Sequence, residues 1–93
     1  MNVTAIKVEL PSGNARDYHG RDAWTLDKLL DAGENGLTTI DHPAPRWSHY
    51  VFRLRKSGLV IETAEERHKG PYPGRHGRYI LRTPLKVIER CAA

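Results

Sequence analysis

Residues 45–61 of the chain read PRWSHYVFRLRKSGLVI, and the organisation of the remaining sequence follows from this stretch. Its residues Trp47, Val51 and Leu54 are spaced at i, i+4 and i+7, which gives one apolar stripe along an α-helix. We therefore predict a helix over residues 45–57, with this stripe facing the core, and a β-strand directly after it.

Both ends of the predicted helix carry residues that helix ends favour. Pro45 suits the first turn, where its missing N–H would have no partner, and Gly58 supplies the left-handed residue that commonly ends a helix. The side opposite the apolar stripe is basic and is predicted to face outward: Arg46, His49, Arg53 and Lys56, with Tyr50 at the boundary. Phe52 also falls on the outward side, where it has three options: the N-terminal strand, thymine methyl groups or a dimer interface.

The sequence before this helix predicts one more helix and a short strand. Alanine and leucine residues form an apolar face over residues 21–32, with Trp24 at its margin, where a core role is more typical than a surface contact. Residues 37–40 are short and β-prone. Residues 41–45, DHPAP, hold too many prolines for a complete second helix.

A β-hairpin is predicted after the basic helix. Residues 58–66 form its first strand, with Leu59 and Ile61 on one face and Val60 and Glu62 on the other. Residues 67–77, RHKGPYPGRHG, have the glycine and proline content of a loop. Residues 79–82 form the return strand.

The two ends of the chain add smaller elements. Residues 3–10 alternate apolar and polar side chains, which predicts a half-buried strand, and residues 15–20 are predicted as a loop. The strand has three possible roles: it adds to the sheet, pairs with a second copy, or only covers the core. Residues 85–90 form a short tail, either a strand or a helical turn.

This order of elements resembles a known family. The run RWSHYVFRLRKSGLVIET, residues 46–63, is similar to the last helix and first wing strand of small bacterial and phage winged-helix domains, which show L-R-(basic)-x-G-(apolar)-x-I-x-T. AWTLDKLLDAGENGLTTID, residues 23–41, resembles their first helix and following turn, so the resemblance covers roughly residues 21–82. It implies an α+β fold: a winged helix-turn-helix with a small antiparallel sheet (the wing hairpin) and an extra N-terminal strand. It also implies DNA binding.

Length and charge agree with that class of function. Ninety-three residues make one domain, in which residues 21–83 form the winged helix, flanked by the N-terminal strand and loop (1–20) and the tail (84–93). Residues 1–45 carry four basic and seven acidic side chains, whereas residues 46–93 carry eleven basic and four acidic ones. A basic half centred on the predicted helix and hairpin is the electrostatic footprint of a nucleic-acid binder.

We predict that helix 45–57 reads the major groove of double-stranded DNA and that the wing, residues 64–78, contacts the backbone or the minor groove. The predicted DNA-binding side chains are Arg46, His49, Tyr50, Arg53, Lys56, Arg67, Lys69, Arg75, His76 and Arg78. Transcriptional regulation in a bacterium or phage is the expected role. The alternative is a winged-helix protein-interaction module without DNA binding. RNA is a third option, with less support because the sequence shows no aromatic platform for bases.

Other chemistry has little support in the sequence. The five histidines lack the close spacing of a zinc pair, and the wing glycines lack the Gly-Lys-Ser/Thr ending of a phosphate loop. Ser48 beside His49 has no acid partner for a triad. We therefore expect no enzyme activity, metal, cofactor or small-molecule ligand. A lone Cys91, no membrane-length apolar run and no secretory signal predict a cytoplasmic protein associated with the nucleoid.

A homodimer is expected on functional grounds. One recognition helix and one wing cover only a short half-site, and a two-fold dimer on a two-fold-related site is the common solution. The strand at residues 3–10, through its open edge, and the apolar tail at residues 85–88 are the surfaces predicted to form it.

Overall fold

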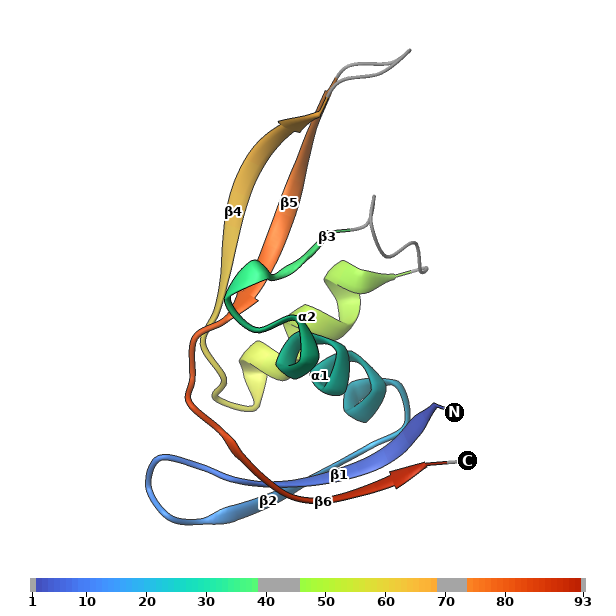
Figure 1. Ribbon diagram of the computed structural model, residues 1–93, viewed down its shortest axis with the longest axis vertical. Helices are drawn as coiled ribbons and strands as arrows, with labels where there is room; N and C mark the ends of the chain where they lie inside the picture. Colours follow the sequence, from blue (N-terminus) through green and yellow to red (C-terminus); the bar gives the residue numbers. More distant parts are fainter. Residues whose placement is uncertain (1, 39–45, 69–73, 93) are drawn as a thin grey trace.

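The computed structural model of the protein describes residues 2–38, 46–68 and 74–92, and it shows two helices lying between two three-stranded antiparallel sheets (Figure 1). The elements follow in the order β1 (Val3–Glu9), β2 (Ala15–His19), α1 (Gly20–Ala32), the short 3₁₀ helix η1 (Gly33–Asn35), β3 (Leu37–Thr38), α2 (Trp47–Lys56), β4 (Ile61–His68), β5 (Gly74–Leu81) and β6 (Lys86–Ala92). The predicted α+β arrangement of helices, hairpin and extra N-terminal strand is confirmed. No helix in these described ranges is long and apolar enough to cross a membrane.

The apolar stripe of α2 lies in the core, as the spacing predicts. Its three residues are at most 4% exposed. They share one buried cluster with Leu26 of α1 and with Leu59, which follows α2. Leu30 is half-buried against the same cluster. Trp24 is half-buried as well, and its ring stacks on Trp47 with the centroids 5.1 Å apart.

α2 begins at Trp47, two residues later than predicted. Arg46 precedes the helix with a left-handed φ of 66°, a conformation that residues other than glycine rarely adopt. The predicted first-turn residue, Pro45, lies outside the described residues. At the other end Gly58 has a φ of 109°, so its predicted positive φ after the helix is confirmed.

The chain ends build one sheet, called the terminal sheet below, with the strand order β2-β1-β6 (Figure 1). Ile6 and Val8 of β1 and Tyr18 of β2 are buried in the core. β1 packs against α1, so this sheet covers one side of that helix. None of the three roles considered for the N-terminal strand describes it fully: it covers the core, but as the central strand of a second sheet.

Two predictions about the terminal segments are wrong. Residues 15–20 form β2 and the start of α1, not a loop, because the turn after Leu10 returns the chain onto β1 and buries Tyr18. The edge of β1 is also not open to a second copy, since β2 and β6 occupy both of its sides. The tail is a strand, the first of the two forms considered for it.

The second sheet, called the wing sheet below, has the order β3-β5-β4. Its hairpin runs further toward its tip than predicted: Arg67 stands opposite Arg75 and His68 opposite Gly74 in the β4–β5 ladder. The loop prediction for residues 67–77 therefore fails at both of its ends, because an antiparallel ladder tolerates glycines that lower strand propensity. β3 is the short strand predicted within residues 37–40, and it pairs with β5.

Gly36 is required where the chain enters β3. Its φ is 70°, and a Cβ at this position would lie 2.7 Å from the backbone oxygen of Tyr79. A glycine therefore lets β3 approach β5 closely enough to pair with it.

Candidate nucleic-acid interface

The C-terminal end of α2 is held by the terminal sheet. The Ser57 hydroxyl donates to the backbone oxygen of Leu54 at 2.6 Å, so its single proton is used, and the Tyr18 hydroxyl donates to Ser57 Oγ at 2.7 Å. The Arg16 guanidinium donates to the Ser57 backbone oxygen. A cation and hydrogen-bond donors at this end suit the exposed carbonyls of a helix C-terminus.

The wing is fixed to the same helix by Arg55. Its guanidinium donates to the backbone oxygen of Ile61, at 3.0 Å from Nε and 2.6 Å from Nη2, and to Thr63 Oγ1 at 2.7 Å. This arginine therefore ties α2 to the start of β4. The role of Arg55 could not be predicted from the L-R-K motif, since nothing in the pattern shows that this side chain turns toward the strand.

The outward face of α2 presents the predicted side chains to solvent. Tyr50 is half-buried on this face, and the exposed residues are Arg46, His49, Phe52, Arg53 and Lys56. The His49 and Tyr50 rings meet edge to face at 5.1 Å. The Phe52 ring is 57% exposed, which removes packing on the N-terminal strand from its options, and Lys56 Nζ lies 5.5 Å from its centroid.

Arg53 is both exposed and held in place. Its Nε lies 2.9 Å from Asp22 Oδ1 and its Nη2 lies 2.9 Å from Asp22 Oδ2. The hydrogen bond to Asp22 and the charge of that carboxylate raise the pKa of Arg53. This ion pair joins α1 to α2 and leaves the Nη1 and Nη2 edge of the guanidinium pointing away from the carboxylate. An arginine uses such an edge of two parallel N–H groups to read guanine.

The residues predicted to contact DNA from the wing lie at different places along the hairpin. Arg78 is half-buried and its Nη1 donates to the Asn35 backbone oxygen at 2.7 Å, so it takes part in the base of the wing. Arg67 and Arg75 face each other in the register, and His76 stands opposite Glu66. Lys69 lies outside the described residues.

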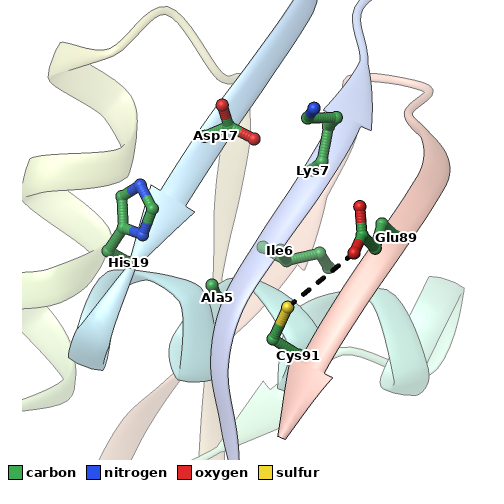
Figure 2. A pocket seen from close by; sticks show the side chains of 7 residues that line it. All are labelled: Ala5, Ile6, Lys7, Asp17, His19, Glu89 and Cys91. Carbon is green, nitrogen blue, oxygen red and sulfur yellow. Dashed lines mark hydrogen bonds between the residues drawn. The ribbon is translucent and has the colours of Figure 1, made fainter.

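A separate hollow lies on the outer face of the terminal sheet, as Figure 2 shows. It measures about 220 Å³ and is lined by Ala5, Ile6, Lys7, Asp17, His19, Glu89 and Cys91. Lys7 stands between Asp17 and Glu89 in the register, so the charges of this row offset one another. Within the described ranges, no group of three or more potential metal ligands occurs here or elsewhere.

A comparison with protein families agrees with this architecture. A family model described as a winged helix domain matches residues 15–91. The match includes β2 and β6, the two strands that the sequence analysis placed outside the winged helix. No curated protein and no solved structure matches the chain.

Proposed function

The chain belongs to the winged helix domain family, and on this basis we propose that it binds double-stranded DNA as a transcriptional regulator, with α2 in the major groove and the wing on the backbone or in the minor groove. One observation carries the proposal: α2 is buried along one stripe and basic along the other, and both its end and its connection to the wing are fixed by hydrogen bonds. The proposed activity is binding alone, without a catalysed reaction. The expected location is the cytoplasm, at the nucleoid.

We assign a separate task to each part of the proposed interface. Arg46 and His49 lie at the first turn of α2, the end that enters a major groove first in helix-turn-helix proteins. Arg53 follows two turns later with its orientation fixed by Asp22. A restrained guanidinium loses less conformational freedom on binding than a free one, which favours base reading at this position.

The proposal is tested by titrating the protein with a mixed-sequence duplex at several salt concentrations. Neutralising phosphates releases counterions, so the logarithm of affinity should fall linearly with the logarithm of salt concentration. Arg75→Ala and Lys69→Ala should each weaken binding to all duplexes about equally and lower this slope by about one unit. Lys86→Ala, at an exposed position of the terminal sheet, is the matched control and should leave the slope unchanged. A wild-type protein without salt-dependent duplex binding would rule out the proposal.

A protein-interaction module is the second candidate, and one observation favours it. Phe52 exposes 57% of its surface in the middle of the outward face of α2, which suits a protein partner as well as a thymine methyl group. Duplex titration of the wild type and of Phe52→Ala distinguishes DNA binding from protein interaction. In a DNA reader the loss should depend on the bases offered, whereas a module of this kind would show little duplex affinity at moderate salt.

The proposal also includes a homodimer, since two copies on a two-fold-related site double a short half-site. With both sides of β1 occupied, the edge of β6 is the better candidate surface. In the described part of the chain β6 pairs with β1 alone, and Ile88 is 51% exposed on it. Light scattering during the duplex titration gives the stoichiometry.

A further inference from the structure

We propose that the cleft between the start of α1 and the outward face of α2 binds one phosphate of the DNA backbone, with Arg21 as its main ligand. This inference rests on the proposed DNA binding and adds a contact from α1. The cleft has a volume of about 350 Å³ and is lined by His19, Arg21, Asp22, His49, Tyr50 and Arg53. Neither His19 nor Arg21 belongs to the helix and wing from which DNA contacts are expected.

The charge of the cleft favours an anion. Its one carboxylate, Asp22, accepts three hydrogen bonds from Arg53 through both oxygens. The positive charge of Arg53 therefore offsets the negative charge of Asp22. In the part of the chain that the structure describes, no carboxylate pairs with Arg21. The remaining lining groups are the two histidines and the Tyr50 phenol, each of which can donate a hydrogen bond to a phosphate oxygen.

Arg21 is held ready for such a ligand by aromatic rings. Its guanidinium carbon lies 4.0 Å from the centroid of Trp24 and 5.8 Å from that of Tyr50. Trp24 in turn stacks on the buried Trp47 at 5.1 Å. Stacking uses the face of the guanidinium and leaves its N–H groups, which lie in the plane, free to donate to a planar or tetrahedral anion. The stack therefore restricts the side chain without occupying its donors.

The place of the cleft fits the edge of a groove. His49 and Arg53 belong both to the cleft and to the outward face of α2, so a phosphate in the cleft would border the groove that α2 enters. In helix-turn-helix proteins the helix before the recognition helix crosses the backbone at this edge. The DHPAP segment, whose prolines predict that it does not form a complete helix, lies outside the described residues. In the described part of the chain α1 is the helix that precedes α2, and a contact from its start gives such an anchor.

The test compares Arg21→Gln with Lys28→Gln in salt titrations of a mixed-sequence duplex. Lys28 is the matched control, because its Nζ lies 5.7 Å from the same Trp24 ring but it does not line the cleft. Arg21→Gln should lower the slope of log affinity against log salt by about one unit for all sequences, as the loss of one phosphate contact does. Lys28→Gln should keep the slope, and Arg21→Lys, which retains the charge, should restore it.

Thermal melting of each variant separates a lost contact from a lost fold, and the slope is compared only among variants that melt as the wild type does. If Arg21→Gln disturbs the fold, His19→Ala, which removes a hydrogen-bond donor from the same cleft, should weaken binding to all duplexes about equally, and an unchanged affinity would overturn the inference. An unchanged slope in folded Arg21→Gln, with salt-dependent binding by the wild type, overturns this inference and leaves the proposed function intact. Absence of duplex binding by the wild type overturns both.

Discussion

The terminal sheet and the wing sheet have the same number of strands and the same antiparallel pairing, yet they are buried very differently. The terminal sheet places Ile6, Val8 and Tyr18 in the core, each at most 7% exposed. The wing sheet buries Ile61 and Ile80 near its base, and Figure 1 shows β4 and β5 continuing away from the helices.

The difference indicates that one sheet stabilises the fold, whereas the other is available to contact DNA. A sheet with one face against helices is stabilised by apolar burial, whereas a hairpin with water on both sides gains little from it. The position of the wing accordingly depends on Arg55 and on the ladder. Substitutions in the terminal sheet should therefore change the free energy of unfolding, and those toward the wing tip should change DNA binding.

The largest expected effect comes from deleting residues 1–12. This change removes β1, the strand that joins β2 to β6, and uncovers the side of α1 that it contacts. We expect the truncated chain to lose its cooperative thermal transition and its near-ultraviolet circular dichroism. A folded truncated chain would show that the terminal sheet is dispensable for folding.

The counterpart to that deletion is a shortened wing, in which Asn-Gly replaces residues 66–76. The buried residues of the wing sheet lie at its base, so the shortened protein should melt cooperatively near the wild-type temperature while its duplex affinity falls. Unfolding of this variant would contradict the division of roles just as clearly.

A smaller effect is expected from Ile6→Ala. Ile6 is 2% exposed in the middle of β1, and truncating a buried isoleucine typically costs about 2–5 kcal/mol of unfolding free energy. Denaturant titration measures this loss. Val60→Ala is the control, because Val60 is 60% exposed before the wing and should change stability by less than about 0.5 kcal/mol. Equal losses of unfolding free energy in Ile6→Ala and Val60→Ala would contradict the assignment of stability to the terminal sheet.

The sequence predicts well those features that depend on local periodicity. The stripe of α2, the positive φ of Gly58 and the placement of Leu59 and Ile61 on the same side all follow from spacing within a few residues. β2 could not be predicted in this way, since Tyr18 is the only buried residue of this five-residue strand and the pairing with β1 is needed to define it.

The candidate site is harder to predict than the fold. The residue types of the basic face are evident from the sequence, but the Asp22–Arg53 ion pair spans 31 positions and exists only because α1 packs on α2. The stacking of Arg21 on Trp24 has a simpler signal, an i, i+3 spacing on one helix. That signal carries meaning only when Trp24 is known to stack on Trp47.

The smallest expected effect tests whether the terminal sheet also serves the interface. Tyr18→Phe removes the hydroxyl that donates to Ser57 Oγ. Ser57 keeps its own bond to the Leu54 oxygen, so no buried donor is left without a partner, and the cost should be about 0.5–1.5 kcal/mol of unfolding free energy. Because Arg16 still holds the Ser57 backbone oxygen, α2 should keep its orientation and duplex affinity should stay unchanged. Ser57→Ala, which removes both side-chain bonds, is the comparison variant and should destabilise more. A Tyr18→Phe protein that melts like the wild type but binds DNA more weakly would mean that the terminal sheet positions α2 for DNA binding. Both sheets would then contribute to binding, although only the terminal sheet is extensively buried.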